Sequence, residues 1–241
     1  MSEFPRSGLV VTAHPGDFVW RAGGAIALHA GLGYRMKVVC LSFGERGEAQ
    51  GSWAQPGMTL EACKAGRRAE AEAAAAILGA EIEFFDAGDY PLRPTAAMLD
   101  RLVDIFRELR PAFVLTHPLA DPYNVDHPEA SRFAQEARII AQAAGHKPGA
   151  GAAYGAPQVF QFEPHQPEQC GFRPDRILDI SGVWDTKWRA FAQLPAQRHL
   201  WDYYQRVALN RGMQGGRNSV RAMTHGEAYQ SIFPEVVGVL A

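Results

Sequence analysis

The sequence predicts a Rossmann-like α/β fold, in which a mostly parallel β-sheet is covered by helices on both faces. Short apolar runs of strand-like character alternate along the chain with longer amphipathic stretches of helical character. Several of these runs are nearly uninterrupted Val, Leu, Ile and Phe, which is the pattern of strands buried on both faces. The length of 241 residues and the apolar content of 47% predict one domain over residues 1–241 with a single large core.

The expected elements follow in chain order. Strands are predicted over 8–13, 36–43, 81–86, 112–117, 157–162 and 176–181, and helices over 19–32, 64–79, 95–109 and 128–144. Repeated strand-then-helix units imply right-handed crossovers and therefore parallel strands. From about residue 183, the aromatic-rich stretch WDTKWRAFAQLPAQRHLWDYYQRVALNRG predicts a helical segment that packs on the sheet or on a neighbouring subunit.

Composition argues against several classes of partner. Lys and Arg number 24 against 26 Asp and Glu, so no basic field favours nucleic acid or an anionic membrane surface. The first residues, MSEFPRSG, lack the pattern of a secretory signal, and no apolar run approaches the ~18 residues of a membrane helix. Cys40, Cys63 and Cys170 show no CxxC spacing, which favours free thiols. We therefore expect a cytoplasmic protein without nucleic-acid or membrane partners.

Polar clusters follow four of the predicted strands. The first strand leads into AHPGD, the second into SFGERGE, the fourth into THPLADPYNVDH and the fifth into FEPHQPEQ. Because ligands bind outside the carboxyl ends of strands in parallel α/β sheets, these clusters predict one site at that edge. A dinucleotide site is disfavoured, since AHPGDFVWRAGG lacks GxGxxG and GERGEAQG lacks the GK[ST] of a phosphate-binding loop.

His14, Asp17 and His127 form a candidate metal site within these clusters. Two imidazoles and one carboxylate are the ligand set of a catalytic zinc, with the remaining positions open to water or substrate. Asp126 is placed to orient a neighbouring ligand from behind. Any one of these histidines taken alone could equally be a loop residue or a helix N-cap. Four further histidines lack ligand spacing and are expected to be structural or exposed: His29, His146, His199 and His225.

Four motifs together resemble the PIG-L/LmbE family of zinc-dependent deacetylases. They are AHPGD, GERGE, RRAEAEAAAAILG (67–79) and HPLADPYNVDH (117–127), in the order typical of the family. The resemblance implies one Zn²⁺ per chain, held by His14, Asp17 and His127. It also implies departures from deacetylase chemistry, because Gly16 stands where deacetylases carry an Asp base and Asn124 stands where they often carry a His.

A narrower resemblance is to the 4-oxalomesaconate hydratase branch of this fold, which acts in bacterial gallate and protocatechuate degradation. It rests on DFVWRAGGAIALHA, VVCLSFGERGE, QEARIIAQAAGHKPG and FEPHQPEQC. The branch adds water to a C=C bond of the tricarboxylate 4-carboxy-2-hydroxymuconate or its keto tautomer, giving 4-carboxy-4-hydroxy-2-oxoadipate. The resemblance implies an acid/base pair of Glu48 and His165. The aromatic C-terminal segment predicts a homo-oligomer, for which relatives of this fold suggest a hexamer; the alternative is that these aromatic side chains pack in the core of their own chain.

Hydration needs one group to activate water and another to protonate carbon, and a Glu and a His from different loops can divide that work. We expect Glu48 to act on the water; otherwise Glu48 is a solvated loop acid and His165 a hydrogen-bonding residue at the core edge. The zinc would act as a Lewis acid on the oxygens at the 2-oxo end of the substrate.

A tricarboxylate substrate also requires cations. Arg21, Arg46 and Arg67 lie on or beside the motif-bearing loops, and Arg can bind a carboxylate bidentately. Arg46, between two loop glycines, is favoured, because Arg67 could instead form a helical ion pair with its i+3 neighbour. Polar contacts to substrate oxygens are expected from Tyr123 and Asn124. The alternatives are a zinc-dependent N-deacetylase of a small amide or amino sugar, and a non-enzymatic or nucleotide-binding module.

Overall fold

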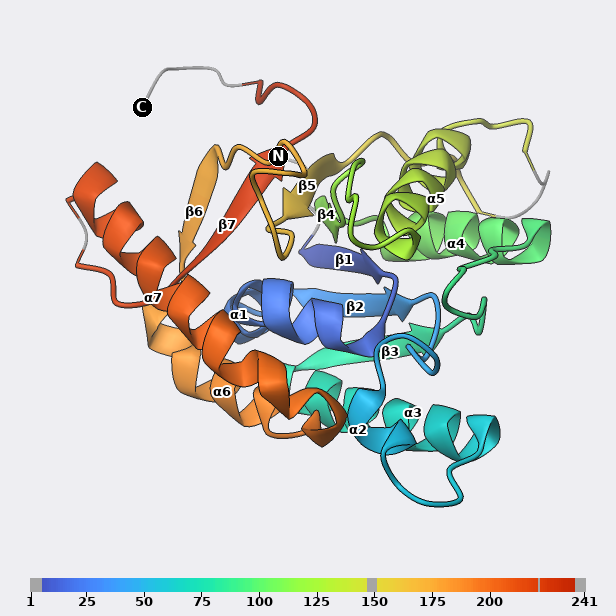
Figure 1. Ribbon diagram of the computed structural model, residues 1–241. Helices are drawn as coiled ribbons and strands as arrows, with labels where there is room; N and C mark the ends of the chain where they lie inside the picture. The colour runs from blue at the N-terminus through green and yellow to red at the C-terminus, as the bar shows by residue number, and fades with distance from the viewer. Residues whose placement is uncertain (1–5, 147–150, 221, 237–241) are drawn as a thin grey trace.

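The computed structural model describes residues 6–146, 151–220 and 222–236. Seven strands form one sheet in the order β3-β2-β1-β4-β5-β7-β6 (Figure 1). The first five strands of this order pair in parallel, and β7 runs antiparallel to both β5 and β6. The predicted α/β architecture is therefore confirmed.

The strands are β1 (Ser7–Thr12), β2 (Arg35–Cys40), β3 (Ala80–Phe84), β4 (Phe113–Thr116), β5 (Gln158–Phe162), β6 (Arg176–Asp179) and β7 (Gly226–Ser231). The α-helices are α1 (Pro15–Gly31), α2 (Gln50–Trp53), α3 (Leu60–Leu78), α4 (Ala96–Leu109), α5 (Asp126–Ala141), α6 (Trp184–Phe191) and α7 (Trp201–Asn218). Two 3₁₀ segments are η1 (Ser181–Val183) and η2 (Pro195–Leu200). No helix in these ranges is long and apolar enough to cross a membrane.

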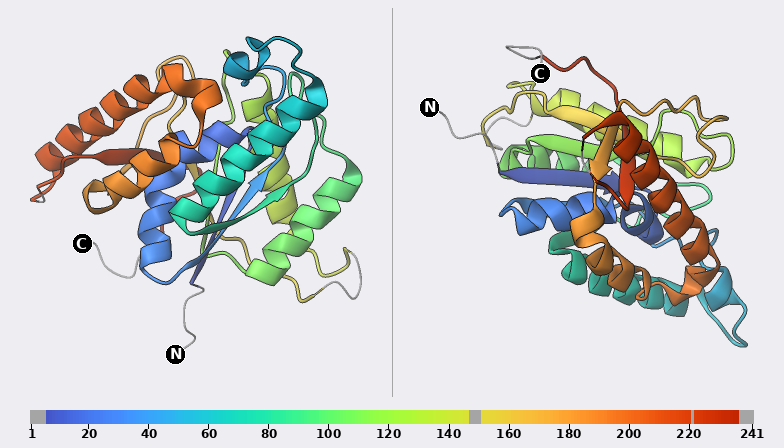
Figure 2. Two further views of the ribbon diagram at one scale, coloured as in Figure 1. Left: turned by 90° about the horizontal axis from the view of Figure 1, so that it is seen from below. Right: turned by 90° about the vertical axis from the view of Figure 1, so that its left-hand side faces the viewer.

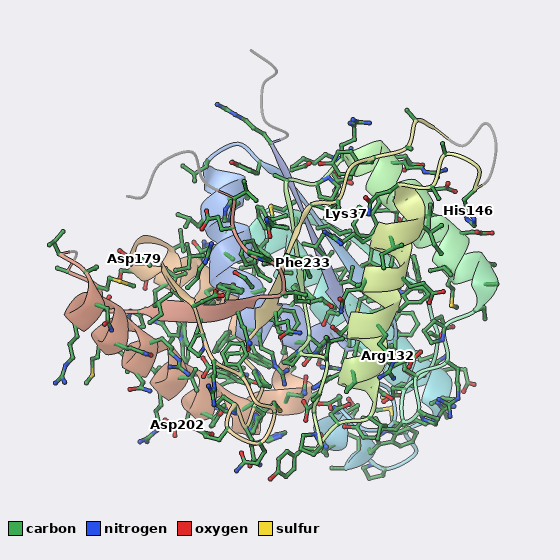
Figure 3. All side chains as sticks on the ribbon, turned by 90° about the horizontal axis from the view of Figure 1, so that it is seen from above. Lys37, Arg132, His146, Asp179, Asp202 and Phe233 are labelled. Atoms are coloured by element: carbon green, nitrogen blue, oxygen red, sulfur yellow. The ribbon has the colours of Figure 1, made fainter. Side chains whose placement is uncertain are left out.

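The sheet separates two hydrophobic cores. Helices α4 and α5 cover one face, and α1, α3 and α6 cover the other (Figures 1 and 2). Val10 and Val38 belong to the core beneath α1 and α3, whereas their neighbours Leu9 and Val39 face α4 and α5. This alternation on two buried faces is why the central strands read as continuous apolar runs. Figure 3 labels Arg132 on α5 and Asp202 at the start of α7.

The C-terminal segment differs from its prediction in one respect. Helices α6 and α7 are present, but β7 follows them and completes the sheet between β5 and β6. Its sequence, GEAYQS, is short and only partly apolar, so its strand conformation depends on the partners on both sides. The tryptophans Trp184, Trp188 and Trp201 pack on one another and on the core of the same chain.

Helix α1 begins at Pro15, four residues before its predicted start, and this places the first motif at the sheet edge. His14 is the extended N-cap residue, and its backbone N–H donates to Asp17 Oδ2 at 3.1 Å. Proline at the first helical position is favoured because it has no N–H to satisfy there. The turn that caps the helix therefore also fixes the side chains of His14 and Asp17.

A buried charge cluster ties the middle of α1 to β7 and α6. Glu227 accepts hydrogen bonds from the backbone N–H groups of Gly24 and Ala25 at 2.7 and 2.8 Å, and from Lys187 Nζ at 2.6 Å. Tyr229 also donates to Glu227 at 2.6 Å. These bonds satisfy the Glu227 carboxylate inside the protein, so this residue supports α1 and does not line the site described below.

Candidate active site

Three buried side chains from two segments converge at the carboxyl ends of β1 and β4. His14, Asp17 and His127 each offer a ligand atom, and these atoms lie within 4.8 Å of one another. His14 and Asp17 come from the turn after β1, and His127 from the first turn of α5. The structure thus assembles the metal-ligand set expected from the sequence.

Two carboxylates hold the imidazoles from behind. His14 Nε2 lies 3.0 Å from Asp126 Oδ2, and His127 Nδ1 lies 2.7 Å from Asp121 Oδ2. Asp126 is itself fixed by the backbone N–H groups of Tyr90 and Leu92, each at 2.8 Å. Such carboxylates orient ligand histidines and raise their basicity. Asp126 has the supporting position predicted for it, whereas the equivalent position of Asp121 is apparent only from the structure.

The residues present fit a divalent cation. His127 Nε2 is buried without a hydrogen-bond partner among the described residues, and it lies 3.6 Å from Asp17 Oδ1. Although burial lowers the pKa of His14, its hydrogen bonds with Asp126 and Asp17 outweigh this effect and raise the pKa to about 10. The surroundings of this imidazole therefore favour positive charge. Nitrogen and carboxylate donors at this spacing are the ligands that zinc prefers.

A cavity of about 200 Å³ adjoins the candidate metal site. Asp17 and His127 line it together with five other predicted site residues: Arg21, Glu48, Tyr123, Asn124 and His165. The side chains come from α1 and from the loops after β2, β4 and β5, which is the edge where the motifs were expected to meet. A larger cavity of about 320 Å³ beside the C-terminal half of α1 is mostly apolar and has no carboxylate in its lining. Of these two cavities, the one of about 200 Å³ contains the carboxylates and most of the polar side chains.

The Glu48 carboxylate is held by three hydrogen-bond donors. Tyr90 Oη and Asn124 Nδ2 donate to Oε1 at 3.0 and 3.2 Å, and Gln197 Nε2 donates to Oε2 at 2.9 Å. Oε1 also lies 4.0 Å from His14 Nδ1, so the carboxylate sits next to the candidate metal ligands. Burial, followed by the charge of Glu48, raises the pKa of Tyr90 above its usual range and keeps its hydroxyl a donor.

The loop that carries Glu48 is fixed by Asp89. The backbone N–H groups of Arg46 and Gly47 donate to the Asp89 carboxylate at 2.8–3.0 Å. A Cβ at Gly47 would lie 2.1 Å from the Tyr90 ring, so only glycine allows Tyr90 to reach Glu48. The second motif therefore needs this glycine for close packing.

Arg46 does not have the position expected from the sequence. Its Nη1 donates to the backbone oxygen of Asp89 at 3.0 Å, its side chain is 51% exposed, and it is absent from the cavity lining. The reason is Asp89, which binds both the backbone N–H and the guanidinium of Arg46 and so holds this residue outside the cavity lining. Arg67 is also outside the cavity: it is fully buried and contacts Glu70 and Gln197.

Arg21 is the cation that reaches the cavity. Its side chain is buried; Nε donates to Tyr204 Oη at 3.2 Å, and Nη2 lies 3.7 Å from Asp17 Oδ1. Nη1 has no hydrogen-bond partner among the described residues. Arg21 lines the cavity, and a guanidinium in a cavity wall is suited to bind a carboxylate.

His165 lies on the loop after β5 and is half-buried in the cavity wall. Its ring stacks on Tyr203 with centroids 4.1 Å apart, and Nδ1 lies 3.5 Å from Tyr204 Oη. Burial lowers the pKa of this imidazole, and the charge of Arg21 acts in the same direction. His165 is therefore neutral at pH 7.

Tyr123 and Asn124 both line the cavity but differ in exposure and contacts. Tyr123 is 57% exposed at the rim, whereas Asn124 donates to Glu48 and, at 2.8 Å, to Tyr90 Oη. Sequence reasoning did not identify Tyr90 and Gln197, since neither belongs to a motif. His199, expected to be structural or exposed, is exposed and also lines the cavity.

Comparison with known proteins identifies close and distant relatives. Residues 9–138 match the PIG-L family, described as GlcNAc-PI de-N-acetylase. A 4-oxalmesaconate hydratase of Pseudomonas putida is 58% identical over 240 residues, covering 98% of this chain and 93% of the relative. A diacetylchitobiose deacetylase of Thermococcus kodakarensis is 28% identical, covering 86% of this chain and 78% of the relative.

Solved structures give the same ranking. The crystal structure of a 4-carboxy-2-hydroxymuconate hydratase from Pseudomonas putida superposes with a TM-score of 0.94 at 58% identity, covering 98% of this chain and 99% of the other. A diacetylchitobiose deacetylase from Pyrococcus horikoshii shares the fold, with a TM-score of 0.78 at 20% identity and coverage of 95% and 86%. The similarities favour a hydratase over a deacetylase, and the family match over most of the core shows that the chain belongs to the PIG-L family.

Proposed function

We propose that this protein is a zinc-dependent hydro-lyase that adds water to a C=C bond of 4-carboxy-2-hydroxymuconate or its keto tautomer, 4-oxalomesaconate. The product is 4-carboxy-4-hydroxy-2-oxoadipate. The observation that carries the proposal is the placement of an oriented carboxylate, Glu48, and a neutral imidazole, His165, in one cavity beside three candidate metal ligands. The 58% identity to a hydratase supports the substrate class.

His14, Asp17 and His127 would hold one Zn²⁺ per chain. When bound, the ion supplies a Lewis acid for oxygens at the 2-oxo end of the substrate. The remaining work falls to residues of the chain itself.

Glu48 accepts the proton of the attacking water. Its two oxygens are fixed by donors from three different segments, so the carboxylate is oriented before the substrate binds. A positioned base of this kind avoids the cost of ordering it during the reaction.

His165 handles the second proton. Because it is neutral at rest, it must take up a proton before it can deliver one, and the enol hydroxyl of 4-carboxy-2-hydroxymuconate is the source. The water supplies hydroxide to the carbon that bears the extra carboxylate, and the two neighbouring carbons each gain one proton. One of these protons comes from water through Glu48 and the other from the enol through His165, so the reaction balances.

Arg21 binds a substrate carboxylate, with Tyr123 at the rim and the Asn124 amide nearby. We expect Arg21→Lys to raise KM by about 10-fold or more, because Lys keeps the charge but lacks the planar fork. Arg46→Ala is the matched control and should leave KM unchanged, since Arg46 faces away from the cavity. Steady-state kinetics with circular dichroism as a folding check measure both; equal KM values for Arg21→Lys and the wild type would contradict the role of Arg21.

The pH dependence follows from the lowered pKa of His165. The neutral form of His165 is the active one. We therefore expect kcat/KM to be constant above pH 6.5 and to decrease only at lower pH, where the pH passes through the lowered pKa of His165. Residual activity of His165→Gln should lack this acid limb. A wild-type limb centred above pH 6.5 would be inconsistent with the environment of His165.

The assay that separates the proposed function from N-deacetylation uses two readouts. Loss of the muconate absorbance should follow addition of the enzyme, and acetylated amino sugars should release no amine. The reverse result would make the deacetylase the correct assignment.

The cellular setting is also part of the proposal. We infer a single-domain cytoplasmic enzyme of gallate and protocatechuate degradation that forms a homo-oligomer, with a hexamer as the expected assembly. Light scattering at micromolar concentration tests the assembly, and a monomer would contradict it.

A further inference from the structure

Gln197 connects a buried cation to the Glu48 carboxylate. This residue of η2 is 2% exposed; its Oε1 accepts from Arg67 Nη2 at 2.8 Å and its Nε2 donates to Glu48 Oε2 at 2.9 Å. The orientation of the amide is fixed by its partners, because a guanidinium can only donate and a carboxylate can only accept. The amide therefore lies between a positive and a negative group with its dipole aligned to both.

Arg67 holds the amide from the other side. It is fully buried in α3, and its Nη1 is paired with the carboxylate of Glu70. The i,i+3 ion pair is thus present as the sequence suggested, but Arg67 also has a second donor that reaches η2. Through this contact α3 fixes where Gln197 sits.

Gly16 provides the space that Gln197 occupies. A Cβ at position 16 would lie 2.4 Å from Gln197 Oε1 and 2.5 Å from Trp20 Nε1. Any other residue at this position must displace Gln197 or Trp20. The glycine of AHPGD and the glutamine of η2 therefore form a matched pair, although 181 positions separate them.

We propose that Gln197 is a positioning residue for Glu48, an assignment that rests on the proposed function of Glu48 as the base of the hydration. Tyr90 and Asn124 both bind Oε1, and Gln197 is the donor to Oε2 among the described residues. Without Gln197 the carboxylate can rotate about its Oε1 contacts and lose its direction toward water. Small misplacements of a reacting group cost up to ~100-fold in rate.

The decisive variant is Gln197→Glu. It keeps the shape and the acceptor for Arg67, but it removes the donor to Glu48 and places a second carboxylate beside it. The two carboxylates repel each other and the donor to Oε2 is lost, so Glu48 should turn away from the position in which it meets the water. We expect kcat at pH 7 to fall by about 10- to 100-fold, with a smaller change in KM. Gln193→Glu is the matched control, since the Gln193 side chain donates to a backbone oxygen of α6 and is not part of the cavity lining.

A second variant tests the space at position 16. Gly16→Ala should lower kcat by displacing Gln197. It should add little when Gln197 is already Ala, because both changes would act on the same contact. Additive losses in the double variant would show that Gly16 acts independently of Gln197.

The same variants are compared at one pH by ¹³C NMR of glutamate-labelled, zinc-loaded protein, with the Glu48 carboxyl signal assigned from Glu48→Gln. We expect the chemical shift of this signal to change in Gln197→Glu and to stay at the wild-type value in Gln193→Glu, because only Gln197 donates to Oε2 among the described residues. This readout requires no turnover, so it tests the contact even if the wild type fails to hydrate the muconate and the proposed function falls. If the wild type is active but Gln197→Glu retains its kcat and the wild-type Glu48 carboxyl signal, Gln197 only packs the core and the assignment is overturned.

Discussion

Glu48→Gln should lower kcat for hydration by about 100- to 10,000-fold, equivalent to roughly 3–5 kcal/mol of barrier. The amide is nearly isosteric and its oxygen can still accept from Tyr90 and Asn124, but its NH₂ group loses the bond from Gln197 and cannot accept the proton of water. Metal content and melting temperature should stay at the wild-type values. The measurement is the initial rate of absorbance loss, with zinc determined by mass spectrometry on the same samples.

His165→Ala should show a loss of similar size with zinc retained, since His165 lines the cavity but lies outside the group of metal ligands. Glu72→Gln makes a matched control: Glu72 is exposed on α3, where it pairs with Arg68 at 3.7 Å. Its activity should equal that of the wild type. Near wild-type hydration by Glu48→Gln would show that another group activates the water.

His127→Ala should remove most of the bound zinc together with the activity. Its Nε2 is the buried nitrogen that faces Asp17 without another partner among the described residues, so the variant loses one of three ligands. Asp121→Asn should have a smaller effect and lower the metal affinity by about 10- to 100-fold, because the Asp121 carboxylate orients the imidazole of His127. Metal titration against a competing chelator measures both effects.

His146→Ala controls for the general cost of removing a histidine. His146 follows the end of α5, and its Nε2 lies 2.9 Å from Asp100 Oδ1 on α4. The His146→Ala variant should keep a full equivalent of zinc. Full zinc occupancy in His127→Ala would rule out the proposed ligand set. Loss of zinc from His146→Ala as well would point instead to general destabilisation.

The sequence by itself determined the parallel core of the sheet and the candidate metal-ligand set. Strands with both faces buried must be apolar throughout, so β1, β2 and β4 were visible without knowledge of their neighbours. The carboxyl ends of parallel strands meet at one edge, so His14, Asp17 and His127 could be placed together from topology alone. The resemblance to the hydratase branch added Glu48 and His165.

Tertiary structure decided which arginine lines the cavity and what binds the Glu48 carboxylate. The sequence favours Arg46 for its place between two glycines, but Asp89, 43 positions away, binds both its backbone N–H and its guanidinium, outside the cavity lining. In the sequence Arg21 is one position of a helix, and only the fold shows that this buried residue lines the cavity. Gln197 and Tyr90 carry no motif, because hydrogen bonds to Glu48 across 149 and 42 positions leave no periodic trace in the chain. Local pattern thus encodes burial and strand ends, whereas the direction of a side chain at a loop depends on contacts made only after the chain has folded.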